Sequence, residues 1–226
     1  MATVQDIVNR VRSAIDELSV TTGSDFIDTT GDEGNLVQLI KDKIEYALAF
    51  VLEHAPLDKF DDDSLQTLDA ATIANSFSIN GSTLVGRLAL PDNVLRIIEA
   101  RLSSWSYYPI PVPDSSPIYL MQQDQYAMGS YDRPVNIYTF DGSKRYLEMY
   151  CAKTTSDTLK FTYIAKPSIN TSSLNNPVNV PSRLEGALVY QVAGLTLEAF
   201  REESARDMFT IARGYLDISV ENDNGQ

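Results

Sequence analysis

The chain has 226 residues, of which 43% are hydrophobic and 22% are charged, and this composition excludes an intrinsically disordered protein. The formal net charge of −13 argues against a protein that grips the phosphate backbone, because such proteins present a basic face. The acidic excess suits either solubility or a channel through which DNA passes without sticking. No apolar run reaches the about 18 residues of a membrane helix, and the first residues do not resemble a secretory signal, so we expect neither.

The N-terminal part has the apolar spacing of helices. Thr3 and Asp6 have the spacing of a capping box, and an apolar stripe with helical period follows them up to Leu18. A second stripe predicts a helix over 35–54, which Pro56 ends. The acidic, Gly-containing stretch between the two helices, 21–34, is typical of an exposed loop.

A third helix is predicted over 64–76, because the acids Asp61, Asp62 and Asp63 suit the start of a helix.

The middle of the chain changes to short alternating runs rich in Tyr, Val, Ile and Thr, which predict strands. Asp141-Gly142-Ser143 is a strong hairpin signal between two of them. The segment 107–117 has four prolines and cannot be a central strand. Ser116 and Pro117 predict the start of a short helix over 118–128. The predicted strands are Leu84–Leu90, Val94–Trp105, Val135–Phe140, Arg145–Cys151 and Leu159–Ile164.

The C-terminal part returns to helix after a polar linker over 166–180. Ser182 and Glu185 have the spacing of a capping box, and one helix is predicted from Arg183 to Leu216, with Gly194 as the place where it would bend. Several small residues on this helix would let another helix approach closely: Gly186, Ala187, Ala193, Gly194 and Ala199.

These patterns predict an α+β fold, in which N- and C-terminal helices form a helical bundle that carries an inserted antiparallel β-rich module. The expected parts are a bundle over 1–80 and 181–220, an insert over 84–165, a linker over 166–180 and a flexible tail over 221–226.

The residues that carry most enzyme and metal chemistry are scarce. His54 is the only histidine and Cys151 the only cysteine; we interpret them as a residue at a helix end and a buried structural residue. The three consecutive acids at 61–63 lack the alternate spacing of a calcium loop, and 28–34 lacks the lysine of a phosphate loop. Paired carboxylates among 31 acids have no specificity. We therefore expect no catalytic residues, no metal and no cofactor.

The aromatic residues of the middle segment allow two interpretations. They can form a platform on which sugar rings stack, or they can serve β-sheet packing and protein interfaces, where Tyr and Trp are enriched. The residues concerned are Trp105, Tyr107, Tyr108, Tyr119, Tyr126 and Tyr131.

The arrangement resembles the head–tail connector proteins of tailed bacteriophages, also called adaptor, head-completion or ring proteins, of the podovirus type, and those of crAss-like phages among them. Three features carry the resemblance: the two N-terminal helices separated by an acidic loop, the phrase Leu90-Pro91-Asp92-Asn93-Val94-Leu95-Arg96-Ile97, and the phrase Val180-Pro181-Ser182-Arg183-Leu184-Glu185 that leads into the last helix. The β-rich insert is larger than in minimal members of this family.

The resemblance implies a structural virion protein that is not an enzyme. Such proteins form a ring, usually of twelve copies, between the portal protein and the next ring or the tail nozzle. DNA passes through the ring without specific binding, and no membrane is involved. The expected location is the neck of the virion, which assembles in the host cytoplasm.

The candidate interface residues are the exposed apolar or aromatic groups that such contacts need, together with the last helix. They are Phe26, Ile27, Trp105, Tyr107, Tyr108, Tyr119, Arg206, Tyr215 and Leu216. The candidates also include the whole proline-rich loop Tyr107–Tyr119 and the terminal helix around Arg206–Leu216. The alternative function is a carbohydrate-binding module on a tail-associated protein, which requires an exposed Trp105. A hydrolase that acts through acidic residues is a further alternative, and it requires a cleft that holds a carboxylic acid of raised pKa.

Overall fold

The computed structural model describes residues 2–22, 33–61, 64–68, 77–80, 83–124, 126–130 and 132–218. The chain forms two compact units. The terminal unit comprises Met1–Ser64 and Lys166–Gln226, and the middle unit comprises Leu65–Ala165. The middle unit is therefore inserted between the two halves of the terminal unit.

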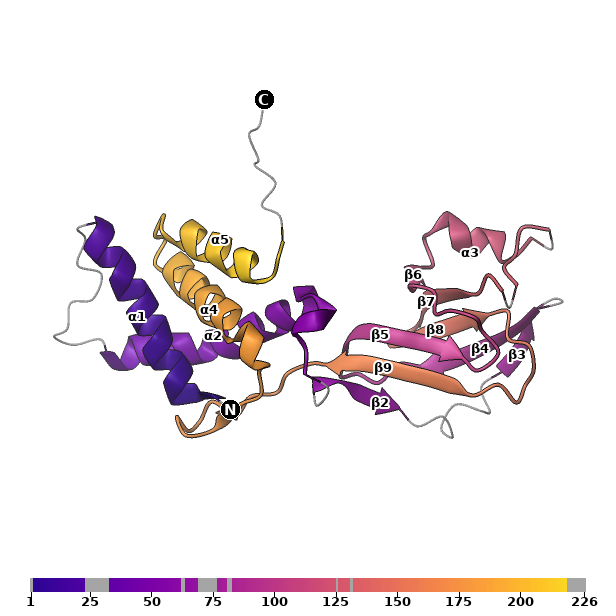
Figure 1. The fold of residues 1–226 in the computed structure, drawn as a ribbon, viewed down its shortest axis with the longest axis horizontal. Coiled ribbons are helices and arrows are strands. Elements are labelled where there is room, and N and C mark those ends of the chain that lie inside the picture. Colours follow the sequence, from indigo (N-terminus) through magenta and orange to yellow (C-terminus); the bar gives the residue numbers. More distant parts are fainter. Residues whose placement is uncertain are drawn as a thin grey trace, which may run out of the picture. The chain divides into compact units, whose positions relative to one another are not determined.

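The terminal unit is mostly helical (Figure 1). Its helices are α1 (Val4–Thr22), α2 (Glu33–His54), α4 (Glu185–Ala199) and α5 (Ala205–Tyr215), and its short strands β1 (Ala2–Thr3) and β10 (Pro177–Val178) pair antiparallel.

Helix α4 is the centre of the terminal unit, and α1, α2 and α5 all contact it. It is apolar on nearly every side, and such a helix has to be covered on every side. The predicted stripe of α1 is confirmed, since these residues of α1 are buried: Val4, Ile7, Val8, Val11 and Ile15.

Helix α5 approaches α4 closely because two positions of α4 have no side chain. A Cβ atom on Gly194 would lie 2.6 Å from the ring of Phe209, and one on Gly186 would lie 2.8 Å from the ring of Tyr215. Tyr215 also stacks on Tyr190, with 5.8 Å between the ring centroids. The prediction that small residues here admit another helix is thus confirmed at Gly186 and Gly194.

The capping box predicted at the start of the first helix is confirmed. The Thr3 N–H donates to the Asp6 carboxylate at 2.8 Å, and the Asp6 N–H donates to the Thr3 hydroxyl at 3.2 Å. The linker after the middle unit serves the same helix end, because the N–H groups of Val4 and Gln5 donate to the carbonyls of Asn176 and Leu174.

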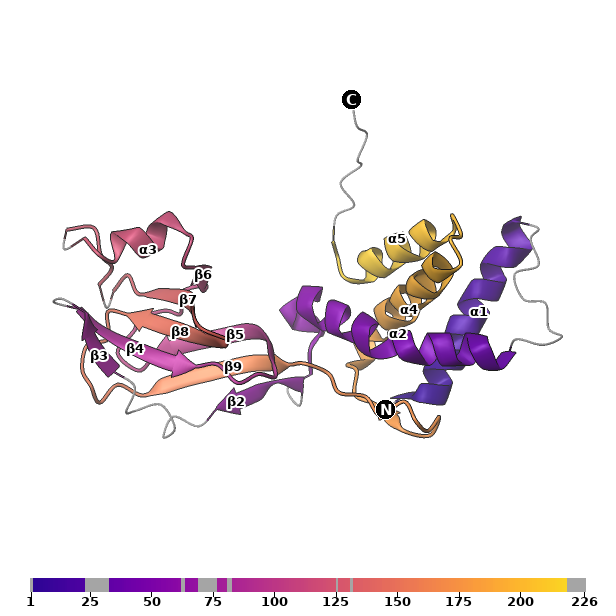
Figure 2. The ribbon, with the colours of Figure 1, turned by 180° about the vertical axis from the view of Figure 1, so that it is seen from behind.

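The fold class expected from the sequence is wrong. The described residues form a mixed α/β structure with strands in three sheets, and no terminal helical bundle is evident among them. Helix α2 crosses α1 and α4 at a steep angle instead of running alongside them (Figure 1 and Figure 2). The apolar period of a helix predicts which face is buried, whereas the crossing angle depends on how the side chains of both helices fit together.

The single helix predicted over 183–216 is also wrong, because the chain reverses between α4 and α5. Arg201 has a φ of 60°, the Arg201 N–H donates to the Glu198 carbonyl, and the Glu202 N–H donates to the Leu197 carbonyl. This pattern is a Schellman motif, in which glycine usually takes the left-handed position. The same motif ends α5, with Asp217 at a φ of 55°.

The middle unit contains two sheets. One has the order β2-β9-β5, and the other has the order β3-β4-β8-β7-β6. All pairs are antiparallel except β6 and β7. The strands are β2 (Gln66–Leu68), β3 (Phe77–Asn80), β4 (Thr83–Ala89), β5 (Val94–Leu102), β6 (Val112–Pro113), β7 (Val135–Asp141), β8 (Lys144–Tyr150) and β9 (Leu159–Ala165), and the short helix α3 covers Pro117–Met121.

The two sheets share one core, as in a β-sandwich. Leu88, Leu147 and Met149 come from one sheet, and Leu102, Leu159 and Phe161 come from the other. The hairpin predicted at Asp141-Gly142 is confirmed, since β7 and β8 pair from Val135↔Tyr150 to Asp141↔Lys144.

Three local predictions are wrong. Residues 66–68 form strand β2 instead of the start of a helix. The helix predicted over 118–128 ends at Met121. The Ser182–Glu185 capping box is absent, because 182–184 form a 3-10 turn and α4 has no side-chain cap. Glu185 pairs instead with Arg10 at 2.6 Å, a partner distant in sequence that no local pattern could reveal.

Replacing Arg201 with Gly is expected to raise the free energy of unfolding by about 1 kcal/mol, because glycine adopts a positive φ without the clash of a Cβ atom. Urea unfolding measures this change. Arg213→Gly is the matched control. Because Arg213 lies within α5, this replacement is expected to lower the free energy of unfolding by about 1 kcal/mol. Equal losses in both variants would contradict a left-handed backbone at position 201.

Asp157 links two segments of the middle unit, the turn after β5 and the turn after β8, through hydrogen bonds to its carboxylate. Its buried carboxylate accepts hydrogen bonds from the Ser104 hydroxyl at 2.6 Å and from the Lys153 N–H at 2.9 Å. Burial alone raises the pKa of Asp157, but hydrogen bonds from Ser104, from the N–H groups of Thr154 and Lys153, and from Ser103 hold the pKa below its ordinary value of 3.8.

A folded-state pKa below the unfolded one means that Asp157 stabilises the fold fully above pH 3.8, and that this stabilisation is lost as the pH falls through the folded-state value. Asp157→Asn is expected to cost about 1–3 kcal/mol at neutral pH, because two or more donors lose a charged acceptor. The deficit should shrink on acidification, as measured by urea unfolding from neutral to acidic pH. A deficit that stays constant with pH would contradict this role of the carboxylate.

Candidate interaction surface

Helix α3 is held against the outer face of the β3-β4-β8-β7-β6 sheet by its polar and aromatic residues. Ser116 caps it as predicted, since its hydroxyl accepts from the Ile118 N–H at 3.3 Å, and Pro117 occupies the first turn. The Tyr119 ring meets the edge of the Tyr150 ring, with 6.5 Å between centroids. Gln122 is buried; its side chain donates to the Ile118 carbonyl and accepts from the Gly129 N–H.

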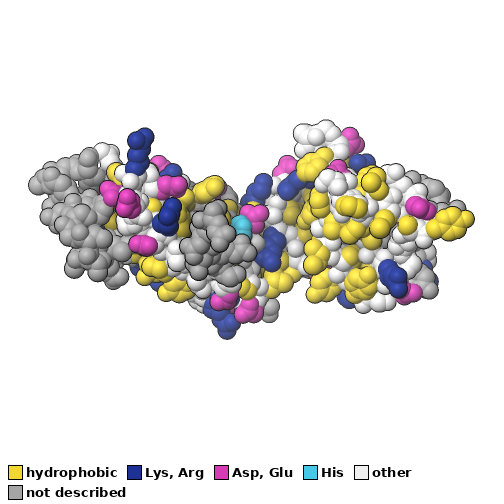
Figure 3. All heavy atoms as spheres, turned by 90° about the horizontal axis from the view of Figure 1, so that it is seen from above, with side chains coloured by type: hydrophobic (Ala, Val, Ile, Leu, Met, Phe, Trp, Pro, Cys, Tyr) yellow, Lys and Arg dark blue, Asp and Glu magenta, His cyan; other side chains and the backbone are white. Residues whose placement is uncertain are grey.

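Because Tyr119 and Gln122 take the inner face, the aliphatic residues of α3 point to solvent. Leu120 is 65% exposed, and Tyr126, just after the helix, is 96% exposed. Figure 3 shows hydrophobic side chains gathered over this part of the middle unit. We call this set the α3 surface. It comprises Tyr107, Tyr108, Ile110, Ile118, Leu120, Met121 and Tyr126, all of them exposed.

The segment that carries the α3 surface is almost free of charge. Residues 103–132 include three Asp and no Lys or Arg, in a chain with 49 charged residues of these four kinds. Patches of exposed apolar side chains on this scale mark interaction sites. The surface therefore suits contact with a protein and lacks the cations that would hold nucleic acid.

The candidate interface residues fall into different environments. Tyr107 and Tyr108 are exposed on the α3 surface, whereas Tyr119 is half-buried and anchors α3. Phe26 and Ile27 lie outside the described residues, and so does Tyr131 among the aromatic residues considered above.

Trp105 is buried in the core of the sandwich, at 5% exposure, which corrects its assignment to an interface. Its indole N–H donates to the Cys151 carbonyl at 3.1 Å. The hydrogen bond explains how a residue with a polar N–H is accommodated in the core.

Only some of the candidate interface residues on the last helix are exposed. Arg206 is exposed and Tyr215 is 45% exposed, but Leu216 is buried, so its assignment as an interface residue is corrected. Lys59 caps the end of α5 by donating to the Tyr215 carbonyl and pairing with Asp217, both at 2.5 Å. Removal of the chain from Tyr215 onward would therefore disturb the packing of α5 itself.

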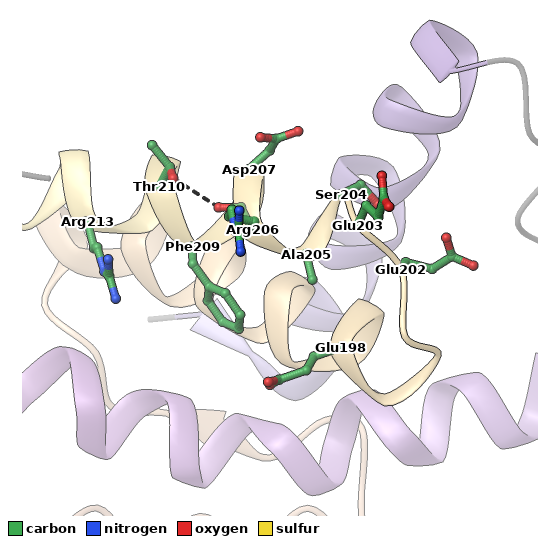
Figure 4. Close-up of a pocket in the computed structure, with 10 residues that line it drawn as sticks. All are labelled: Glu198, Glu202, Glu203, Ser204, Ala205, Arg206, Asp207, Phe209, Thr210 and Arg213. Carbon is green, nitrogen blue, oxygen red and sulfur yellow. Dashed lines mark hydrogen bonds between the residues drawn. The ribbon is translucent and has the colours of Figure 1, made fainter. Parts of the chain in front are cut away.

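A groove of about 910 Å³ lies where α4 turns into α5 (Figure 4). Phe209 points from α5 toward α4, whereas Asp207 points away from it. The lining mixes both signs of charge, so it does not select an anion or a cation. The charged residues are Glu198, Glu202, Glu203, Arg206, Asp207 and Arg213.

The described residues show no grouping of His, Cys, Asp or Glu that could hold a metal ion. Burial raises the pKa of the Cys151 thiol to about 11, so this cysteine is protonated at neutral pH and a poor nucleophile. His54 stands at the end of α2, as predicted, with its ring stacked on Phe50 and Nδ1 2.9 Å from the Phe50 carbonyl oxygen. None of the described helices is both long and apolar enough to cross a bilayer.

Sequence reasoning included Ile110 and Ile118 within the proline-rich loop Tyr107–Tyr119 but missed Leu120 and Met121. Every residue of the five-residue helix α3 except Pro117 is large and apolar, so its pattern does not show which side faces the sheet. The burial of Gln122, which leaves its aliphatic neighbours outward, has no signal in the sequence, because Gln123 beside it is the same residue type and is exposed.

No protein-family description matches the sequence, and a comparison with curated proteins found no match either.

Tyr119→Ala is expected to destabilise the middle unit by about 2 kcal/mol, because it removes the ring that packs on Tyr150. Hydrogen exchange at the amides of 118–123 should accelerate in the same variant. Leu120→Ala, one position on, is the control and should change stability by less than about 0.5 kcal/mol. A larger effect at Leu120 than at Tyr119 would contradict the orientation of α3.

Proposed function

We propose that this chain is a structural subunit that works by binding other proteins and catalyses no reaction. The α3 surface carries the proposal, since a folded helix that keeps its polar residue inside and its aliphatic residues outside gains stability only when a partner covers them. Cys151 and His54, the only cysteine and the only histidine of the chain, have structural surroundings.

Within this class, the proposed protein is a head-to-tail connector of a tailed bacteriophage. Copies of the chain form a ring, twelve in the family that the sequence resembles, between the portal protein and the next ring or the tail nozzle. The proposal rests on the resemblance that the phrase Leu90–Ile97 helps to carry; in the structure this phrase forms the tight connection between the two sheets. The Val94 N–H donates to the Pro91 carbonyl, while Leu90 and Val94 are buried in the shared core.

The charge of the chain also supports a place around the DNA path. At a net charge of −13, the surface repels phosphate groups, so DNA can slide through without specific binding. The corresponding location is the virion neck. The carbohydrate-binding alternative has weaker support, because the only tryptophan of the chain is buried and cannot stack on a sugar.

The test is mass photometry of the purified chain, alone and mixed with the portal protein encoded in the same genome. We expect a discrete complex that contains the portal ring and about twelve added copies, since repeated contacts around a rotation axis close at a fixed number. A portal protein from an unrelated phage is the control. If the chain does not bind its own portal protein even when the chain is in large molar excess over the portal ring, the result would contradict the connector proposal.

A further inference from the structure

We propose that the α3 surface binds a second copy of this chain. This inference builds on the proposed assembly function and assigns one of its contacts: the neighbouring copy takes this surface, and the portal and the tail use others.

The size of the surface fits a stable contact between two proteins. Tyr126, Ile110 and Leu120 are 96%, 83% and 65% exposed. If each large side chain presents on the order of 150–250 Å² when free, the exposed parts of these seven side chains add up to roughly 650–1,100 Å². A standard interface buries about 800 Å² on each partner. The exposed area of these side chains is therefore of the size that one partner buries in such an interface, with the polar residues around them forming its rim.

The distribution of charge favours a second copy as the occupant. Two chains that each have a net charge of −13 repel each other, and the repulsion is least where charged groups are fewest. The segment 103–132 is such a place, because it has three Asp and no basic residue. A basic partner would be attracted elsewhere on the acidic chain at least as strongly, and an acidic partner or nucleic acid would find no cation here.

The surface is also fixed in shape before any partner arrives. The Ser116 cap, the Tyr119–Tyr150 ring contact and the two hydrogen bonds of Gln122 hold α3 in place. The Tyr126 N–H donates to the Asp124 carboxylate at 2.8 Å, which fixes the turn after the helix. A surface that is already ordered loses little conformational freedom on binding.

Sedimentation of the full chain over roughly 1 to 500 µM tests the proposal. We expect reversible self-association that strengthens when sodium chloride rises from about 50 to about 500 mM, because salt screens the repulsion between acidic chains. Leu120→Glu and Tyr126→Glu should each weaken the association by about tenfold or more. Tyr46→Glu is the matched control, since Tyr46 is 67% exposed on α2 of the terminal unit and its replacement adds the same charge.

Circular dichroism of each variant checks that the fold is kept; Tyr126 is so exposed that its replacement has no packing to break. A chain that stays monomeric over the whole range, or that associates equally in the Leu120 and Tyr126 variants, overturns the proposal. Association that weakens with salt overturns it as well, because that result points to charge pairing.

The outcomes separate this inference from the connector proposal. Self-association that stops at dimers supports the α3 contact but contradicts a ring built through it. Larger closed assemblies support both. Binding to the portal protein by a chain that shows no self-association leaves the connector proposal standing and overturns the α3 contact.

Discussion

A helix that is apolar on nearly every side needs protein on nearly every side, and α4 is such a helix. Its burial requires α1 and α2 from the N-terminal part and α5 from the C-terminal part. Both ends of the chain are thereby brought to one core, and the middle unit becomes an insertion instead of a separate C-terminal domain. Gly186 and Gly194 set how near α5 can come, so the rings of Tyr215 and Phe209 occupy the space that side chains would otherwise fill.

In the middle unit the packing is between two sheets instead of around one helix. Its two sheets cover each other's inner faces, and the N–H of Trp105 is satisfied inside by the Cys151 carbonyl. The outer face of the larger sheet is then left with Val85, Ile137 and Tyr150, which Tyr119 of α3 helps to cover. The covering helix is so short that its own remaining aliphatic residues stay partly exposed, Ile118 at 38%, Met121 at 51% and Leu120 at 65%. The exposed surface thus follows from the way the sheet is closed.

Some local signals were predictable, although the local predictions at 64–68, at 118–128 and at Ser182–Glu185 were wrong. The Asp141-Gly142 turn and the Thr3–Asp6 capping box depend on residues a few positions apart, and both predictions held. The turn after α4 and the turn after α5 could not be predicted in the same way, because Arg201 and Asp217 respectively occupy the position where glycine is the usual marker. The crossing of the helices and the outward side of α3 depend on long-range packing, and a periodic pattern in one segment does not encode either. The candidate surface was therefore predicted in the proline-rich loop Tyr107–Tyr119 and at Tyr126, but not at Leu120 and Met121.

The insertion also has a consequence for the order of events on the ribosome. The sandwich, contained within Leu65–Ala165, can collapse as soon as β9 emerges, because all its strands have by then been synthesised. Helices α1 and α2 leave the ribosome earlier but have to wait for α4, which lies more than a hundred residues downstream. During that interval the apolar faces of α1 and α2 are open to solvent, so the N-terminal part of the nascent chain is the part most exposed to aggregation.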